Sequence, residues 1–287
     1  MKVPLSFKLI IIYTNIKLKI IQLLSPKQAA AIAFKRFCTP YSGKPKRIAP
    51  SIFNNANTLN FKFDKLTIRG WNWQPQTSDN KKILIVHGFD SCSYRFDNYI
   101  QPLINAGFEV FAFDAPGHGI SDGTTINGLQ YCNVILEIEK LYGSFYCIMA
   151  HSLGGLAAAL AMEQMSNQAE RKLVLIAPAT ETTSAVKNYF RFVRVSSKTK
   201  AAFNELMFTI SNKPVSWYSA ARAVNNVAAN ILWVHDEEDF ICAFGDVSPV
   251  QQANHKHIQF YLTKGLGHSG VYRRQPVFDE IIKFIKT

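Results

Sequence analysis

The sequence predicts an α/β fold with a mostly parallel central sheet flanked by helices. From residue 61 onward, short apolar runs of strand length alternate with stretches long enough for one helix, a pattern typical of a parallel sheet. Residues 67–73 precede this series, alternate apolar and polar side chains, and are expected to form an edge strand. The runs expected to form buried strands are 83–86, 110–113, 146–149, 173–176, 231–234 and 258–261.

The charge of the chain is unevenly distributed. Of 287 residues 48% are hydrophobic, which is enough for a large core, and the net charge is +12. Residues 1–60 hold ten Lys or Arg and no Asp or Glu, whereas the rest holds 22 basic and 20 acidic residues. A nucleic-acid-binding protein would be expected to be basic throughout, so no nucleic-acid partner is predicted. We expect a basic N-terminal helical arm over 1–60 and a nearly neutral main domain over 61–287.

Two helices are expected in the arm. Lysines interrupt residues 5–24 too often for a membrane-spanning helix, and no clear cleavage site for a signal peptide follows. A second helix is expected over 27–37, between Ser25-Pro26 and Thr39-Pro40. We expect both helices to pack on the main domain; peripheral membrane contact of residues 1–24 as a basic amphipathic helix is the alternative. The apolar residues of the first helix recur at steps of four and three, as on one helix face: Leu5, Leu9, Ile12, Ile16, Ile20 and Leu23.

The cysteines and histidines predict neither disulfides nor a metal site. The five cysteines are odd in number and show no paired or metal-binding spacing, which favours a reducing compartment and a cytoplasmic location. Cys132 and Cys147 lie in apolar stretches, where a thiol behaves as a small hydrophobe. The one close histidine pair, His255 and His257, has no carboxylate or thiolate ligand beside it.

The strongest chemical signal is AHSLGG at 150–155, between an expected strand and an expected helix. A serine in a sharp strand-to-helix turn projects its hydroxyl above the sheet, and small neighbours let the helix pass close to the strand. Gly154 and Gly155 supply small neighbours after the serine, while Ala150 replaces the usual first glycine. Ser152 is therefore the candidate nucleophile.

A serine hydroxyl needs a base to take its proton, and the base needs an acid to fix its tautomer. In this architecture the chain order is serine, then acid, then histidine. Asp239 follows the expected strand 231–234, and His268 follows the expected strand 258–261. Both residues lie beyond carboxyl ends of strands, where open α/β sheets place their sites. We therefore expect Asp239 and His268 to act with Ser152.

Two backbone N–H groups are needed to bind the negative charge that develops on a carbonyl oxygen during attack. One is expected from Leu153, the residue after the nucleophile. The other is expected from Phe89, in the loop after the early strand 83–86, where Gly88 allows a tight turn.

Five ordered motifs resemble those of the α/β-hydrolase superfamily over residues 61–287. They are HGF at 87–89, DAPGHGISDG at 114–123, HSLGG at 151–155, HDEED at 235–239 and GLGH at 265–268. The resemblance implies an α/β-hydrolase fold and favours Asp239 over Asp236, because Asp239 lies at the family's usual step of four residues after His235. Ser121 and Asp122 of the second motif are expected to cap the next segment. The superfamily includes esterases, lipases, thioesterases, peptidases and lyases, so these motifs do not specify the substrate.

We expect a serine hydrolase that cleaves a carboxylic ester or thioester through an acyl-serine, with no cofactor or metal. Residues 181–230 are too long for one helix with its turns and are rich in aromatic residues, so a small helical cap is expected there. Aromatic residues in the cap favour an apolar acyl or alcohol group as substrate. A catalytically silent binding protein of this fold and an acyltransferase are the alternatives. The sequence does not predict an oligomeric state.

Overall fold

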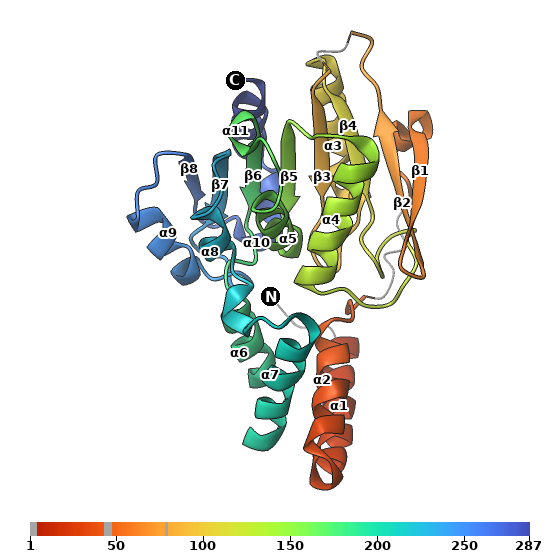
Figure 1. Ribbon diagram of the computed structural model, residues 1–287, viewed down its shortest axis with the longest axis vertical. Helices are drawn as coiled ribbons and strands as arrows, with labels where there is room; N and C mark the ends of the chain where they lie inside the picture. The colour runs from red at the N-terminus through yellow and green to blue at the C-terminus, as the bar shows by residue number, and fades with distance from the viewer. Residues whose placement is uncertain (1–4, 43–47, 78–79) are drawn as a thin grey trace.

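An eight-stranded sheet in the order β1-β2-β4-β3-β5-β6-β7-β8 forms the centre of the molecule (Figure 1). The computed structural model describes residues 5–42, 48–77 and 80–287, with the backbone alone for residues 5–9. Strands β3 to β8 pair in parallel, whereas β2 pairs antiparallel with both β1 and β4. The strands are β1 (Asn57–Phe63), β2 (Leu66–Trp73), β3 (Lys82–Val86), β4 (Glu109–Phe113), β5 (Cys147–His151), β6 (Lys172–Ile176), β7 (Asn230–Asp236) and β8 (Ile258–Thr263).

The predicted α/β fold is confirmed, and each of the six expected runs lies largely in a strand. The last run, 258–261, lies in the edge strand β8, where Ile258 alone is buried, so its expected burial is wrong. The expected edge strand at 67–73 is wrong as well. Residues 67–73 lie in β2, which is the second strand, because β1 pairs along its outer side from Asn57 to Phe63. Phe61 of β1 is buried in the core, which gives this outer strand an apolar anchor. The expected boundary at residue 61 therefore falls inside a strand, and residues 57–60 belong to the sheet.

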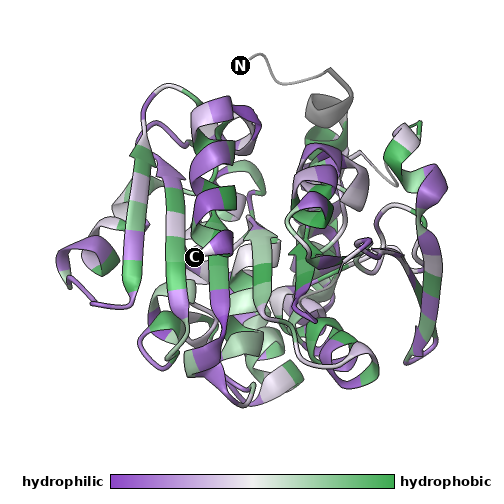
Figure 2. Cartoon of the chain, turned by 90° about the horizontal axis from the view of Figure 1, so that it is seen from above, coloured by the Kyte–Doolittle hydropathy of each residue, from purple (hydrophilic) through white to green (hydrophobic). Residues whose placement is uncertain are grey.

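Helices cover both faces of the sheet, and they show hydrophobic and hydrophilic bands (Figure 2). Helices α4, α5 and α8 contribute to the core on one face, and α3 and α11 contribute to the core on the other. Strands β5 and β6 are buried along their whole length, which explains why they are apolar except for His151 at the end of β5 and Lys172 at the start of β6. The helices around the sheet are α3 (Asp97–Asn105), α4 (Gly128–Tyr142), α5 (Leu153–Met162), α8 (Ala220–Val224), α9 (Ser248–Gln252), α10 (Gly267–Gly270) and α11 (Gln275–Lys286).

Four helices form a separate bundle beside the sheet, which we call the helical module (Figure 1). They are α1 (Leu5–Leu24), α2 (Pro26–Phe37), α6 (Thr182–Phe192) and α7 (Ser197–Ser211). The expected insertion at 181–230 thus supplies α6 and α7, which pack against the N-terminal helices rather than standing alone. The module has its own apolar cluster: Leu18, Ala29, Ala30, Ala33, Val186, Tyr189, Val193, Phe203 and Met207.

Helix α1 packs on residues 192–196 of the main domain, as expected, but not through the predicted apolar face. Its buried side chains are Thr14 and Leu18, whereas Ile12, Ile16 and Ile20 are more than half exposed. The periodic spacing identified an apolar face correctly, but spacing carries no information on whether another helix covers that face. Among the described helices, none is both long enough and apolar enough to cross a membrane.

Candidate active site

Ser152 lies in the turn between β5 and α5. Its backbone has φ 55° and ψ −123°, a sparsely populated region for a residue with a side chain. Neighbouring backbone holds the turn in place: the Ser152 N–H donates to the Ile176 oxygen at 3.1 Å, and the Ser152 oxygen accepts from the Ala179 N–H at 2.9 Å. The serine is therefore fixed at the carboxyl end of the sheet.

A close approach of α5 to β3 explains the glycine after the serine. A Cβ atom on Gly154 would lie 2.4 Å from the His87 oxygen and 2.9 Å from the Val86 oxygen, too close for any side chain. Ala150, which replaces the usual first glycine, is fully buried within β5 and pairs with Val86. The turn therefore forms with a methyl group at this position.

His268 lies between Ser152 and Asp239 and contacts both. Its Nε2 atom is 2.9 Å from the Ser152 Oγ, and its Nδ1 atom is 2.7 Å from the Asp239 Oδ2. The other oxygen of Asp239 accepts from the N–H groups of Ile241 at 2.8 Å and Cys242 at 2.9 Å. Because a carboxylate only accepts, the Nδ1 atom carries the proton and Nε2 is free to accept from the serine hydroxyl.

Asp236, the neighbouring carboxylate, is buried but does not contact His268. Its Oδ2 atom accepts from the Thr263 hydroxyl at 2.7 Å and the Leu266 N–H at 2.9 Å, and its Oδ1 accepts from the Glu238 N–H at 3.0 Å. Burial raises the pKa of Asp236, but these hydrogen bonds lower it by a larger amount. The pKa of Asp236 therefore lies below the ordinary value. Asp236 therefore ties the end of β7 to the loop that carries His268.

The surroundings of His268 act on its pKa in opposite directions. Burial lowers the pKa, whereas the neighbouring Cys242 and the hydrogen-bonded Asp239 raise it, and the balance lies above the ordinary value of 6.5. His151 differs: burial lowers its pKa well below 6.5. His151 Nε2 lies 3.1 Å from the backbone oxygen of His268 and, as the only possible donor of the pair, supports the loop that carries His268.

The loop after β3 carries Phe89 next to the turn that holds Ser152 and Leu153. A Cβ atom on Gly88 would lie 2.8 Å from the Ser152 Cβ, so this loop passes very close to the serine. Both Phe89 and Leu153 line the same cavity as Ser152. Within the part of the chain that the structure describes, neither N–H donates to a protein acceptor. Two donors beside the serine are thus available to a substrate oxygen.

His87 sets the orientation of the Phe89 N–H. The Ala115 N–H donates to His87 Nε2 at 2.9 Å, so the ring proton resides on Nδ1, which donates to the Gly88 oxygen at 2.8 Å. Burial lowers the pKa of His87 to about 4, which keeps the ring neutral. In a trans peptide the carbonyl and the following N–H point in opposite directions. By holding the Gly88 carbonyl, His87 therefore fixes the direction of the Phe89 N–H.

The motif at 114–123 shapes a loop, but the expected cap is wrong. Asp122 accepts from the Thr67 N–H at 3.0 Å and pairs with Arg69 at 2.7 Å, and Ser121 accepts from the Arg69 N–H at 2.9 Å. Both side chains thus tie the loop back to β2. The next helix, α4, is capped by Asn127 instead, whose side chain accepts from the third residue of the helix.

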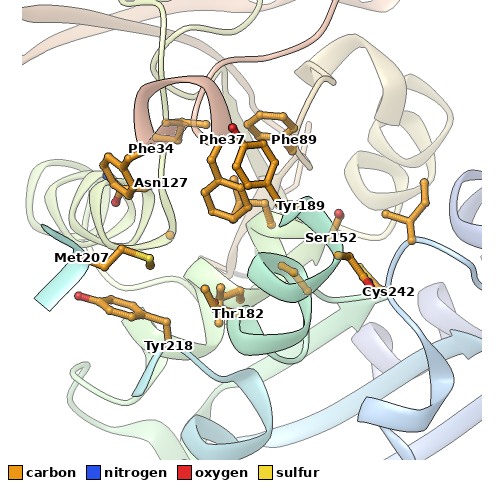
Figure 3. A pocket seen from close by; sticks show the side chains of 18 of the residues that line it. Phe34, Phe37, Phe89, Asn127, Ser152, Thr182, Tyr189, Met207, Tyr218 and Cys242 are labelled. Carbon is orange, nitrogen blue, oxygen red and sulfur yellow. The ribbon is translucent and has the colours of Figure 1, made fainter. Parts of the chain in front are cut away.

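A largely apolar cavity of about 580 Å³ opens beside Ser152 (Figure 3). Its walls come from all four helices of the helical module and from the loops that carry Ser152 and Cys242. Side chains that line it include Ile11, Phe34, Phe37, Tyr41, Phe89, Leu153, Tyr189, Phe192, Met207, Ile210, Phe240 and Ile241.

Sequence reasoning missed several residues of this site. Phe34 and Phe37 line the cavity from α2, a helix to which we had assigned no role in the site. Their spacing of three on one helix face was a usable signal. Cys242 borders the cavity beside His268, and nothing in its local sequence indicates this position.

One group in the described residues has the geometry to hold a metal ion. Ligand atoms of Asp239, Cys242 and His268 lie within 4.8 Å of one another. Asp239 and His268 are already joined by a hydrogen bond, so a metal there would compete with the arrangement around Ser152.

The fold and the strand-to-serine-to-helix turn define the class of protein. An esterase of Pyrococcus furiosus has a similar structure, with a TM-score of 0.59 at 15% identity over 85% of this chain and 95% of that one. A monoacylglycerol lipase of Paleococcus ferrophilus gives 0.57 at 19% identity over 76% of this chain and 98% of that one. This chain therefore has the α/β-hydrolase fold.

The family can be stated more narrowly. Residues 77–229, more than half of the chain, match the model of the serine aminopeptidase S33 family, and the protein belongs to this family of α/β-hydrolases. A serine hydrolase-like protein of Dictyostelium discoideum is 25% identical over 177 residues, which cover 58% of this chain and 45% of the relative. The chain thus matches less than half the length of this relative. Together these similarities establish the family and the fold of the chain.

Proposed function

We propose that the protein cleaves carboxylic esters or thioesters through an acyl-serine intermediate, with Ser152 as nucleophile, His268 as base and Asp239 as the acid that orients the base. The observation that carries this proposal is the position of His268, which is within hydrogen-bond distance of both Ser152 and Asp239. This geometry supports proton transfer from the serine hydroxyl to Nε2 during attack.

Each step of the reaction has a group to serve it. Ser152 Oγ attacks the acyl carbon while His268 accepts the hydroxyl proton, and Asp239 stabilises the imidazolium that forms. The N–H groups of Phe89 and Leu153 bind the oxyanion, and loss of one such donor typically costs about 3 kcal/mol. His268 then protonates the leaving alcohol or thiol, and a water activated by the same base releases the acid.

The cavity favours an apolar group on the substrate. Its volume falls within the range of sites for small molecules, and aromatic and aliphatic side chains dominate its walls. Because the cavity begins at Ser152, an acyl chain or an apolar alcohol bound there would place its carbonyl at the serine. We therefore favour esters with an extended apolar group over acetyl esters.

The proposal is tested with nitrophenyl esters of graded acyl length and with matching thioesters and amides. We expect turnover of esters and thioesters that rises with acyl length, and a loss of about 10⁴ to 10⁶ in the Ser152→Ala variant. Ser152 contributes little packing, so the variant should unfold at nearly the wild-type temperature. Near-normal turnover by the variant would refute the mechanism. Ester formation with an added alcohol, in place of hydrolysis, would indicate an acyltransferase.

A further inference from the structure

Helix α1 is held in a fixed orientation on the helical module. The Asn15 side chain donates to the Phe192 oxygen at 3.0 Å and accepts from the Arg194 N–H at 2.8 Å. One turn further on, Leu18 is fully buried in the module's apolar cluster. The Gln22 side chain accepts from the Ser196 N–H at 2.7 Å. One face of α1 is thus committed to the module.

The opposite face of α1 is apolar and uncovered. We call it the outer face, and its six side chains are between 54% and 86% exposed: Ile12, Tyr13, Ile16, Ile20, Leu23 and Leu24. A contiguous set of large apolar side chains on one helix face costs solubility unless something covers it. In the described residues no other segment packs on this face.

Lysines border the outer face on both sides. At about 100° per residue, Lys17 and Lys19 fall on opposite edges of the arc that holds Ile16. Both lysines are exposed, and helix α1 contains no acidic residue. An apolar face flanked by lysines is the pattern of a helix that lies in a membrane interface, where lysine stems run along the apolar zone and their ammonium groups reach the headgroups.

The charge of the whole module fits an anionic surface. Its four helices hold ten Lys or Arg and a single acid, Glu205, which pairs with Lys27 at 3.9 Å. A second copy of this chain on the same face would bring like charges together across the interface, which disfavours a dimer. Anionic phospholipid headgroups would be attracted by the same charges.

From this combination we propose that the outer face of α1 docks the protein on the surface of a membrane that contains anionic lipid. The helix lies in the plane of the interface, with its apolar side chains in the boundary between headgroups and acyl chains. Ile11, the neighbour of Ile12, lines the cavity on the other side of the same helix. Docking therefore places one wall of the cavity against the membrane. None of the outer-face residues belongs to the proposed catalytic group, so docking can be tested apart from catalysis.

Co-sedimentation of the full chain with vesicles tests this proposal. The vesicles contain phosphatidylcholine alone or with about 30% phosphatidylserine, in the range of anionic inner leaflets. We expect binding to the anionic vesicles that weakens at high salt. The Ile16→Gln/Ile20→Gln variant should lose binding. Because each lysine near the surface contributes about fivefold to partition, Lys17→Gln/Lys19→Gln should bind about 25-fold more weakly at low salt.

Leu141→Gln is the matched control, since Leu141 is also an exposed apolar residue, 48% accessible, on α4. It lies about 20 Å along the helix from Gly128, which lines the cavity. This variant should bind vesicles like the wild type, and all variants should melt near the wild-type temperature because their side chains are exposed. Absent vesicle binding, or binding that the outer-face substitutions leave unchanged, would overturn the proposal. A dimer in size-exclusion chromatography that Ile16→Gln/Ile20→Gln dissociates, without vesicle binding, would assign the face to a second copy instead.

Discussion

Replacing Asp239 by Asn should disable the base without disturbing the fold, and the structure explains why. One carboxylate oxygen accepts from the N–H groups of Ile241 and Cys242. An amide NH₂ group cannot accept, so the Asn oxygen must occupy this position and the NH₂ group must face His268. The His268 Nδ1 atom then has to accept, which moves the ring proton to Nε2. A protonated Nε2 cannot take the proton of Ser152.

The expected magnitude follows from this tautomer change. In serine proteases the same substitution lowers turnover about 10⁴-fold. The unfolding free energy should change little in comparison, because the Asn oxygen retains both backbone hydrogen bonds at the turn after β7. The assay is kcat/KM on one nitrophenyl ester, together with denaturant unfolding of the same preparation.

Asp236→Asn is the matched control, three residues away in the same turn. Its two oxygens together accept from the Glu238 and Leu266 N–H groups, so either orientation of the amide leaves one backbone donor unpaired. A buried unpaired donor costs about 1–3 kcal/mol of stability. We therefore expect Asp236→Asn to reduce stability with a mild effect on turnover, the reverse of Asp239→Asn. A severe loss of turnover in Asp236→Asn beside near-normal turnover in Asp239→Asn would refute this reasoning.

Two further predictions concern the base and the serine turn. Because His268 must be neutral to accept a proton and its pKa is raised, kcat/KM should fall as the pH drops through a value above 6.5. The Cys242→Ala variant should move this fall to lower pH, because it removes one group that raises the pKa of His268. A pH profile that the variant leaves unshifted would contradict the assigned cause. In a denaturant titration, Gly154→Ala should lower the unfolding free energy by about 1–3 kcal/mol, since its Cβ would lie 2.4 Å from the His87 oxygen. Gly245→Ala is the control and should be neutral, because a Cβ at Gly245 would have nothing within 4 Å. Equal effects of the two alanines would show that close packing does not explain Gly154.

The sequence predicted the parallel core well because buried strands leave a strong local pattern. Each of the six expected runs lies largely in a strand, and the order of the motifs brings Ser152, Asp239 and His268 to one edge of the sheet. Strand β1 was missed, although Leu59 and Phe61 alternate with polar residues as in a strand. We assigned residues 57–60 to the arm because the first 60 residues contain no Asp or Glu, but charge composition says nothing about strand pairing.

Tertiary contacts decide the features that local pattern could not predict. Helical periodicity identified the apolar face with Ile12 and Ile16, but α1 packs through Leu18, which lies outside that stripe. The walls of the cavity join α2 to α6 and α7, which are separated by more than 140 residues. Likewise, the role of His87 depends on the Ala115 N–H, which only the folded loop brings to its ring.

Labelling with a fluorophosphonate tests the acyl-serine mechanism most directly, because the probe reacts only with an activated serine. The labelled protein is digested, and the modified residue is located by mass spectrometry. We predict one phosphonyl group per chain, attached to Ser152, with labelling abolished in Ser152→Ala and strongly slowed in His268→Ala. Absence of labelling in the folded wild-type protein, or an adduct at a residue other than Ser152, would contradict the mechanism.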